Sequence, residues 1–350
     1  MSHTAEDLRA LQSKTLEEKI QISTARIIEW YQKNGGKVHV AFSGGKDSTV
    51  LLDLVRRIYP DVPAIFVDTG LEYPELREFV KTIHNVTWLK PEMSFRKVIE
   101  KYGYPLISKE VAGHIYSARN KPNGKTAQRF EDGNSHDIKY GTMYSYAKWK
   151  PLKDSCIPIS SMCCDIMKKK PAKKYERQTG SKPILGTMAS ESRSRRYAWM
   201  KNGCNSFDVV RPASKPMSFW TEQDVLRYIS KFNIPYASVY GEIKQDENGN
   251  YYTTGCNRTG CVFCGFGCHL EKWPNRFQRL AITHPQLYDY CMRGGKYDES
   301  GKWVPDKGLG MAKVLDFINV KWWNDGDEAK RDEYRAKYKE KEQEHETNQI

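Results

Sequence analysis

The sequence lacks any long hydrophobic run, and this absence excludes one large class of proteins. No stretch approaches the roughly eighteen apolar residues of a membrane span, and the polar first residues, Met-Ser-His-Thr-Ala-Glu-Asp, are not those of a signal peptide. We therefore expect a cytoplasmic protein with no membrane partner. In that reducing compartment, the nine cysteines are expected to be metal ligands, reactive thiols or core residues rather than disulfides.

Acidic residues are the minority among the charged side chains. The chain of 350 residues carries 43 Asp and Glu against 56 Lys and Arg, which gives a formal charge of +13. This excess favours a polyanionic partner such as nucleic acid, although a nucleotide enzyme can also be basic. The length allows one large domain or two smaller ones.

Two common phosphate-binding signatures, the Walker loop and Gly-x-Gly-x-x-Gly, are missing. The chain has instead an apolar run at 38–42, a Gly-Gly turn, and the spacing of an amphipathic helix at 49–58. Backbone N–H groups, hydroxyls, a lysine and a helix N-terminus would together form an anion cradle. We expect a phosphate to be bound there by Ser43, Gly44, Gly45, Lys46, Asp47 and Ser48. An ordinary glycine-rich turn is the alternative.

The motif Ser-Gly-Gly-Lys-Asp-Ser resembles the PP-loop of the ATP pyrophosphatases, whose relatives include the adenosine-phosphosulfate and phosphoadenosine-phosphosulfate (PAPS) reductases. The resemblance implies an α/β fold with a doubly wound parallel sheet of the adenine nucleotide alpha hydrolase-like, Rossmann-like type. Strands and helices predicted alternately from 38 to 102 agree with a parallel sheet. The turn Asp68-Thr69-Gly70 follows the predicted strand 64–67 and resembles the second motif of the reductases, so these three residues are expected beside the nucleotide.

We predict four consecutive parts of the chain. They are a helical cap at 1–36, a nucleotide-binding α/β domain at 37–240, a Cys-rich iron–sulfur segment at 241–295, and a charged helical tail at 296–350. The alternating pattern lapses at about 104–150, where we expect an insertion or mobile lid, or else a plain surface excursion.

A basic segment lies between residues 166 and 200, with ten Lys or Arg against two Glu. Such a run can be a solvated face. Here it surrounds a predicted strand at 183–188. Gly186 lies within this strand, and Arg193 follows its end. We expect these two residues to help bind the nucleotide, and the segment to bind an anion or a nucleic-acid backbone.

Four cysteines, Cys256, Cys261, Cys264 and Cys268, occur within thirteen residues. A structural zinc site usually draws on two separated knuckles, and this segment has a single Cys-x-x-Cys. An iron–sulfur cluster is ligated by four thiolates. They could be these four cysteines, or a set that includes the vicinal pair at 163–164. Thiols without metal are the third alternative.

The vicinal pair and the knuckle both resemble motifs of adenosine-phosphosulfate reductases. Residues 163–171 are similar to Cys-Cys-x-x-Arg-Lys-x-x-Pro, with Met167 in the place of the arginine, and residues 258–264 are similar to Ser-Ile-Gly-Cys-x-x-Cys. In that family these cysteines hold a [4Fe-4S] cluster. The resemblance therefore implies four ligands here, Cys163, Cys164, Cys261 and Cys264. Cys256 and Cys268 would be additional thiols that shuttle sulfur, form another quartet or pack.

The last absence concerns the C-terminal tail, which has no cysteine after Cys291. Reductases of the family attack with a cysteine in a Glu-Cys-Gly-Leu-His-like tail motif, whereas the strict Ser-Gly-Gly-Lys-Asp-Ser is typical of ATP-cleaving members. The sequence interpretation is therefore an ATP pyrophosphatase that adenylates a nucleic acid (DNA or tRNA) or a nucleotide and supports sulfur transfer. Its catalytic residues would be Lys46, Asp47, Cys256 and Cys268.

This interpretation also implies cofactors and partners. ATP would bind with Mg²⁺ held by Asp47 or Asp68, and a sulfur-donor protein and a homo-oligomer are expected. Two alternatives remain. The first is a sulfonucleotide reductase that releases sulfite, with Cys256, Cys268 or Cys291 replacing the tail cysteine. The second is a nucleotide- and redox-sensing regulator without turnover.

Overall fold

The computed structural model describes residues 3–131, 136–137, 142–143 and 146–347. The chain forms two compact units, one from residues 1–91 and 169–260 and the other from residues 92–168 and 261–350. Each unit combines ranges that are distant in the sequence. The four-part division drawn from motifs stays a prediction, because it follows the sequence and not the contacts.

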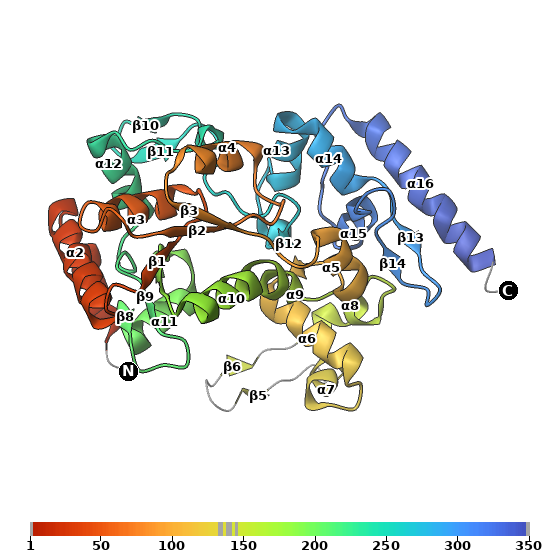
Figure 1. Ribbon diagram of the computed structural model, residues 1–350. Coiled ribbons are helices and arrows are strands. Elements are labelled where there is room, and N and C mark those ends of the chain that lie inside the picture. Colours follow the sequence, from red (N-terminus) through yellow and green to blue (C-terminus); the bar gives the residue numbers. More distant parts are fainter. Residues whose placement is uncertain (1–2, 132–135, 138–141, 144–145, 348–350) are drawn as a thin grey trace. The chain divides into compact units, whose positions relative to one another are not determined.

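The first unit is built on a six-stranded sheet with the order β3-β2-β1-β7-β9-β8. The pairs from β3 to β9 are parallel, and β8 pairs antiparallel to β9. The strands are β1 (Val38–Ala41), β2 (Ala64–Val67), β3 (Val86–Leu89), β7 (Lys182–Leu185), β8 (Asn205–Ser206) and β9 (Ala213–Ser214). In Figure 1, α3 and α4 cover one side of this sheet and α10 the other. The predicted doubly wound α/β fold is confirmed.

The helices of the first unit include those that the sequence pattern predicts, together with helices in the basic segment 166–200 that no sequence signal indicates. They are α1 (Ala5–Gln12), α2 (Leu16–Lys33), α3 (Lys46–Arg56), α4 (Pro74–Thr82), α10 (Lys170–Thr179), α11 (Arg193–Asn202) and α12 (Glu222–Phe232). Thr221 caps α12 and closes a capping box with Asp224, as the spacing of these two residues predicts. A short hairpin, β10 (Ile243–Gln245) and β11 (Tyr251–Thr253), completes this unit.

The order of the strands locates the binding edge. The chain runs from β1 outward through β2 to β3, and then returns on the other side of β1 with β7. The carboxyl ends of β1 and β7 therefore flank the point at which the direction of winding reverses. Ligands of open α/β sheets bind at such a point. The turn after β1 is residues 42–45, the beginning of the PP-loop.

A buried ion pair joins the N-terminal helices to the rest of this unit. Lys19 of α2 donates to both carboxylate oxygens of Asp224, at 2.9 and 2.8 Å. The two side chains are only 3% and 8% exposed. Removing one partner of a buried pair leaves an uncompensated charge in a medium of low polarity.

We expect Lys19→Met to lower the free energy of unfolding by about 3 to 5 kcal/mol, because it leaves the Asp224 carboxylate buried without its counter-ion. Urea denaturation followed by circular dichroism measures the change. The matched control is Lys14→Met, which removes an exposed pair with Glu18 and should cost less than about 1 kcal/mol. Equal losses in the two variants would contradict the structural role of the buried pair.

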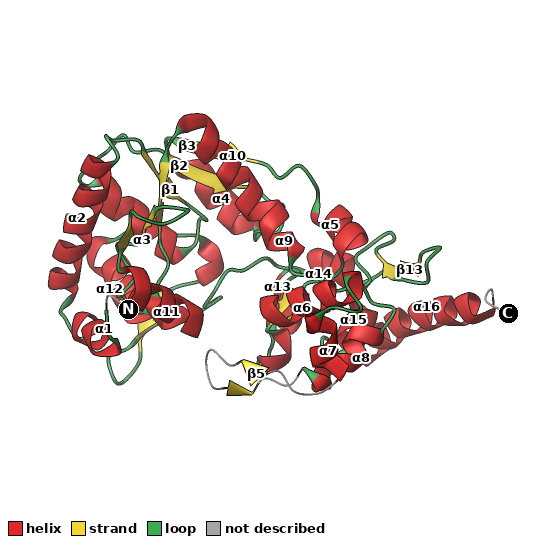
Figure 2. Ribbon diagram, turned by 90° about the horizontal axis from the view of Figure 1, so that it is seen from below, coloured by secondary structure: helices red, strands yellow, loops and turns green. Residues whose placement is uncertain are grey.

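The second unit is mainly helical (Figure 2). Its helices are α5 (Phe95–Tyr102), α6 (Lys109–Asn120), α7 (Lys125–Glu131), α8 (Lys150–Asp154), α9 (Met162–Cys164), α13 (Arg276–Thr283), α14 (Pro285–Met292), α15 (Met311–Phe317) and α16 (Glu328–Thr347). Its short strands are β4 (Leu106–Ile107), β5 (His136–Asp137), β6 (Thr142–Met143), β12 (Gly265–Phe266), β13 (Lys296–Tyr297) and β14 (Trp303–Val304). Among the described residues, no helix is both long and apolar enough to cross a membrane.

The segment 104–107 holds together two stretches of the second unit that carry cysteines. Tyr104 exchanges backbone hydrogen bonds with Pro158 and Ser160, at 2.8 and 3.1 Å, shortly before the vicinal cysteines. β4 then pairs in parallel with β12, which directly follows Cys264. One short extended segment therefore brings the Cys163–Cys164 pair and the Cys261–Cys264 knuckle into the same unit.

Two ranges that the sequence analysis above singles out, 104–150 and 296–350, lie in the second unit. Residues 104–150 contain two regular helices, α6 and α7, that the sequence pattern did not predict, because α6 buries Ala112, Ile115 and Ala118 and shows only a weak apolar stripe. The predicted insertion also includes residues 132–135, 138–141 and 144–145, which lie outside the described residues. The predicted tail helix exists as α16, but Tyr334 is buried, and Asp316 of α15 accepts hydrogen bonds from Arg335 and Tyr338.

Candidate functional site

The PP-loop of the first unit has the shape of an anion cradle. Gly44 has φ +73°, and a Cβ on it would lie 2.8 Å from Cγ2 of Val80, so glycine is required there. The Ser48 hydroxyl accepts from the Ser43 backbone N–H at 3.2 Å and donates to the Gly45 carbonyl at 2.9 Å. These bonds hold the turn against the first residue of α3, Lys46. The helix N-terminus and the glycine backbone thus lie together, as an anion site requires.

Lys46 is almost fully enclosed, although its side chain is charged. Its ammonium group donates to the carbonyl oxygen of Asn257 at 2.5 Å and forms an ion pair with Glu222 at 2.9 Å. Its backbone N–H donates to the Tyr240 hydroxyl at 3.2 Å, and that hydroxyl lies 2.6 Å from the hydroxyl of Thr259. The sequence analysis did not identify Glu222, Tyr240, Asn257 and Thr259, because no local motif marks contacts so distant in the chain.

Asp47, the next residue, has an unusual carboxylate. Its Oδ1 atom is buried and has no hydrogen-bond partner within the described part of the chain. Burial raises the pKa of Asp47, while the nearby charges of Lys46, Arg258 and Arg195 act in the opposite direction. An oxygen in this position fits a hard cation such as Mg²⁺, which prefers carboxylate ligands and water.

The second predicted motif follows β2 in the same unit. Asp68 is buried, and its Oδ2 accepts from Arg77 at 2.8 Å. The backbone N–H of Gly70 donates to Asp68 Oδ1 at 3.3 Å, while Thr69 donates to Glu72 from both its backbone and its hydroxyl. These residues form a fixed turn. Because Asp68 already holds Arg77, Asp47 is the better candidate for a metal ligand.

The turn after β7 closes the cradle on its other side. A Cβ on Gly186 would lie 3.2 Å from the carbonyl oxygen of Asp47, so this glycine lies directly against the start of α3. Arg193 is exposed at the first position of α11, whereas the arginines whose charges act on Asp47 are Arg258 and Arg195. Burial and the like charge of Arg258 lower the pKa of Arg195. The Glu191 carboxylate pairs with Arg195 and lies 3.9 Å from Arg258, so it already offsets part of their repulsion.

Cys256 belongs to the first unit, in the loop that runs from β11 past Lys46. Its backbone N–H donates to the carbonyl of Val239 at 3.0 Å, and its carbonyl accepts from the Thr253 hydroxyl at 3.1 Å. The Cys256 side chain is half-buried, and the next residue, Asn257, supplies the carbonyl that accepts from Lys46. This cysteine is therefore one residue from a direct contact with the PP-loop.

The other predicted site cysteines belong to the second unit. The Cys163 thiol donates to the sulfur of Cys164, at an Sγ–Sγ distance of 4.0 Å, and the backbone N–H of Cys264 donates to the Cys261 carbonyl at 3.0 Å. The hydrogen bond from Cys163, assisted by the charges of Lys109 and Lys168, lowers the pKa of the Cys164 thiol to about 6. Lysines near a thiol favour the thiolate, the form that binds metal.

Charge interactions link all four of these cysteines. After the hydrogen bond to Cys164 and burial, Cys264 and Cys261 also raise the pKa of Cys163. Burial raises the pKa of Cys264 to about 11, and Cys261 and Cys164 add to the effect. Four neighbouring thiols are the donor set of a [4Fe-4S] cluster. Among the described residues, no group of three or more His, Cys, Asp or Glu is placed so that it could hold a metal ion.

Cys268 has a different environment. Its side chain is 1% exposed, and its thiol donates to the Gly265 carbonyl at 3.1 Å. Burial raises its pKa to about 12. The thiol is therefore neutral and enclosed, which makes it a weaker candidate for a nucleophile than Cys256.

Arg276 holds the end of the knuckle in place. One guanidinium nitrogen donates to the Cys264 carbonyl at 2.7 Å, and two others donate to Glu271 at 2.9 and 2.5 Å. This cation at the beginning of α13 thus fixes the backbone at Cys264. Its charge also favours an anionic Cys264 thiolate.

We expect Arg276→Leu to lower the iron content of anaerobically reconstituted protein and to cost about 2 kcal/mol of unfolding free energy, the value of hydrogen bonds to a charged group. Iron analysis and urea denaturation measure the two effects. The matched control is Arg279→Leu on the same helix. Arg279 lies 4.0 Å from Glu271 and donates to the Pro274 carbonyl, but it makes no contact with the Cys264 carbonyl. If both variants keep their iron, Arg276 does not support the knuckle.

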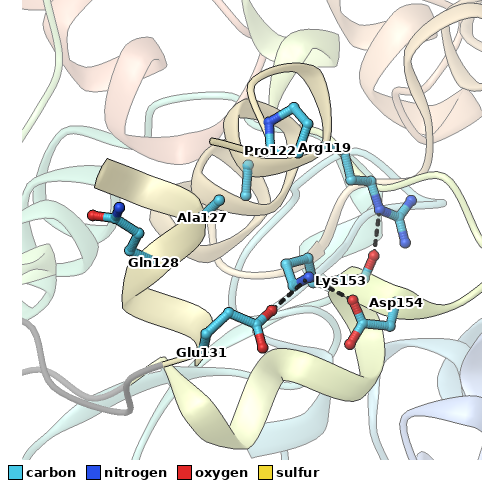
Figure 3. A pocket seen from close by; sticks show the side chains of 8 residues that line it. Arg119, Pro122, Ala127, Gln128, Glu131, Lys153 and Asp154 are labelled. Carbon is cyan, nitrogen blue, oxygen red and sulfur yellow. Dashed lines mark hydrogen bonds and ion pairs between the residues drawn. The ribbon is translucent and has the colours of Figure 1, made fainter. Parts of the chain in front are cut away.

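A hollow in the second unit is distinct from these sites (Figure 3). It has a volume of about 300 Å³, and its lining includes Arg119, Glu131, Lys153 and Asp154. These charged groups already have partners: Arg119 donates to backbone carbonyls of residues 152–157, and Lys153 pairs with Glu131 and Asp154. The hollow contains none of the predicted site residues.

Comparisons with known proteins agree with this picture. The phosphoadenosine phosphosulfate reductase domain matches residues 37–110 and 125–265. Adenosine 5'-phosphosulfate reductase 2 of Bacillus subtilis is 24% identical over 252 residues, covering 70% of this chain and 81% of the relative. The adenosine 5'-phosphosulfate reductase of Lysinibacillus sphaericus is 25% identical over 278 residues, covering 79% and 86%.

A solved structure of phosphoadenylyl-sulfate reductase from Candida auris aligns with 71% of this chain and 98% of its own, at 14% identity and a TM-score of 0.37. The domain match spans more than half of the sequence. It includes the PP-loop, the strands β1, β2, β3 and β7 on the two sides of the winding reversal, and the cysteine knuckle at 261–264. The chain belongs to the family of the phosphoadenosine phosphosulfate reductase domain.

Proposed function

We propose that this chain is a sulfonucleotide reductase whose nucleophile is Cys256. The observation that carries the proposal is the contact between the loop of Cys256 and the PP-loop: the carbonyl of Asn257, the next residue, lies 2.5 Å from the Lys46 ammonium. The relatives named adenosine 5'-phosphosulfate reductase support the class of substrate. The reductase was the alternative in the sequence interpretation, and these relatives favour it over adenylation of nucleic acid.

The reaction follows from these positions. The Cys256 thiolate attacks the sulfur of adenosine 5'-phosphosulfate, an S–S bond forms, and the bond from sulfur to the bridging oxygen breaks. AMP leaves with that electron pair, and Cys256 carries the sulfonate. A dithiol then supplies two electrons: one thiolate attacks the Cys256 sulfur and expels sulfite, and the second thiol resolves the mixed disulfide and restores Cys256.

The PP-loop would act on the leaving group. Charge grows on the phosphate oxygens of AMP as the bond to sulfur breaks, and donors already in place stabilise that charge without reorganising. Lys46 and the backbone N–H groups of the loop are such donors, and Arg195 and Arg258 add positive charge around Asp47. Ser43, Gly44, Gly45 and Ser48 shape the cradle, while Thr69, Gly70, Gly186 and Arg193 are proposed to contact the nucleotide.

We choose Cys256 as the nucleophile on two grounds, the burial of each cysteine and whether it belongs to the same unit as the PP-loop. Cys268 and Cys291 are 1% and 0% exposed and belong to the second unit. Cys204 of the first unit is buried and accepts from the Ser218 hydroxyl. Cys256 is half-buried and belongs to the same unit as the PP-loop, so it best replaces the missing tail cysteine.

We also propose a [4Fe-4S] cluster held by Cys163, Cys164, Cys261 and Cys264. When bound, such a cluster supplies a redox-active centre and a local charge that its surroundings tune. The residues of this chain would orient it: Lys109 and Lys168 favour the Cys164 thiolate, and Arg276 fixes the backbone at Cys264.

A second candidate function is cleavage of ATP to AMP and pyrophosphate, with adenylation of an acceptor. The buried Oδ1 of Asp47, which has no hydrogen-bond partner among the described residues, favours it, because this oxygen suits the Mg²⁺ that accompanies ATP. A DNA or tRNA acceptor, a sulfur-donor protein and a homo-oligomer all stay predictions under this function.

Parallel anaerobic incubations distinguish the candidates. Reconstituted protein is given adenosine 5'-phosphosulfate with a dithiol in one set and Mg–ATP with bulk tRNA or DNA in the other. The proposal expects sulfite and AMP in the first set and no pyrophosphate in the second. Pyrophosphate without sulfite would establish the second candidate, and nucleotide binding without either product would favour a regulator.

A further inference from the structure

The Lys46 side chain joins the PP-loop to the loop that carries Cys256. Its ammonium group has two acceptors, the Asn257 carbonyl at 2.5 Å and Glu222 Oε1 at 2.9 Å. The side chain is only 4% exposed, and an ammonium group has three N–H donors. A phosphate oxygen that binds Lys46 therefore uses the third donor, drawing the ammonium group toward itself, or replaces one of these acceptors.

Glu222 is held at its backbone but not at its side chain. It is the first residue of α12, whose N-terminus is fixed by the capping box of Thr221 and Asp224 and by the buried pair of Asp224 with Lys19. The next residue, Gln223, exchanges hydrogen bonds with the backbone of Tyr251 at 2.8 Å in both directions. The backbone of Glu222 is therefore fixed, while its carboxylate, on a side chain that is 47% exposed, can turn and follow Lys46 without any movement of the helix. The Asn257 carbonyl belongs to the backbone and can follow Lys46 only if its segment moves.

Asn257 belongs to a segment that lies outside regular structure. Residues 254–260 contain neither helix nor strand. Besides the contact with Lys46, the segment has side-chain hydrogen bonds from Thr253 to Cys256 and Asn257, and one between Thr259 and Tyr240. Tyr240 in turn accepts from the Lys46 backbone N–H. The Lys46 ammonium thus donates to this segment directly, and the Lys46 backbone N–H is linked to it through Tyr240. An oxyanion at the PP-loop would use both of these donors.

We propose that Glu222 and the Asn257 carbonyl are positioning partners of Lys46, and that an anion at the PP-loop takes Lys46 from Asn257 and releases the segment 256–259. Substrate binding would then expose the Cys256 thiol only when its target is in place. This inference rests on the proposed function for the role of Cys256. The predicted movement itself requires only an anion and no turnover.

Hydrogen exchange of the full-length protein tests this movement. The probes are inorganic pyrophosphate and AMP, each raised until the amides of residues 43–48 gain full protection. We expect exchange of the Cys256 amide, which donates to the Val239 carbonyl at 3.0 Å, to become about tenfold faster when either probe is bound, the factor given by the loss of one charge-assisted hydrogen bond. Unchanged or slower exchange with a protected loop would overturn the proposal, as would probes that never protect residues 43–48.

Variants connect the effect to Lys46. In Lys46→Met the segment 256–259 should exchange fast without any probe, and addition of a probe should change nothing. Lys244→Met is the control, because Lys244 is an exposed lysine of the same unit that pairs only with Glu242 among the ion pairs described. Normal circular dichroism shows that each variant is folded. A Lys46→Met protein that exchanges like the wild type would overturn the proposal.

Alkylation of Cys256 gives a second readout. Peptide mass spectrometry should show faster modification of Cys256 by iodoacetamide when AMP is bound, with the buried Cys204 as an internal reference. Failure of the proposed function and failure of this inference are distinguishable. A protein that makes no sulfite but still loosens at 256–259 refutes the reaction alone, while one that makes sulfite without loosening refutes only the release of the segment.

Discussion

Cys256→Ser is expected to abolish sulfite formation from adenosine 5'-phosphosulfate, lowering the rate by about a thousandfold or more. A hydroxyl at this position cannot form the S–S bond on which the proposed reaction depends, and loss of a nucleophile is among the largest single effects in enzymes. Sulfite and AMP are measured under anaerobic conditions with excess dithiol. Nucleotide binding should persist, because the PP-loop is unchanged.

The matched control for this variant is Cys204→Ser. Cys204 is the other cysteine of the first unit, and it is buried against Ser218. Its replacement should leave sulfite formation within a few-fold of the wild type. If Cys256→Ser keeps its activity while Cys268→Ser or Cys291→Ser loses it, the nucleophile lies in the second unit and our assignment is wrong.

Lys46→Met should lower turnover by about a hundred- to a thousandfold, the cost of removing one donor to developing negative charge. Methionine keeps most of the volume of the buried side chain and removes its charge. The iron content should stay that of the wild type, because the four proposed ligands belong to the other unit.

Lys244→Met serves again as the control for the loss of a lysine, and it should retain full turnover. Two outcomes would count against the account of Lys46. Undiminished turnover in Lys46→Met would mean that the PP-loop does not stabilise the leaving group, and loss of iron together with activity would mean that the variant has disturbed the fold.

Local signals in the sequence predicted the sheet well, and they placed a turn between β1 and α3. The apolar runs at 64–67 and 86–89 became β2 and β3 with the same bounds, and the Thr221 capping box marks the true start of α12. These features depend on neighbours in the chain, so the sequence displays them directly. α6 was missed because alanine supplies much of its buried face and produces little apolar contrast.

The partners of Lys46 could not be predicted in this way. Glu222, Tyr240 and Asn257 are separated from the PP-loop by more than 170 residues. They meet Lys46 only because α12, the turn at 238–240 and the loop after β11 lie beside the start of α3. Their residue types are common, and no spacing marks them. Such a site is visible only after folding.

Cysteines that are close in the sequence do not all belong to the same unit. Cys256 lies five residues before Cys261, and the two were considered together as parts of one metal-binding segment. Contacts assign Cys256 to the unit of the PP-loop and assign Cys261, Cys264 and Cys268 to the other unit. The chain leaves the first unit at Gly260, and this division, which no motif signals, makes Cys256 the best candidate nucleophile.

The measurement that tests the central claim most directly is a trapping experiment. The reconstituted protein is mixed with adenosine 5'-phosphosulfate in the absence of any thiol reductant, digested without reduction and analysed by mass spectrometry. We predict that one SO₃ group is found on the peptide that contains Cys256, in an amount equal to the AMP released, and that added dithiol frees it as sulfite. AMP release with the SO₃ group on another cysteine, or with none on the protein, would contradict the account.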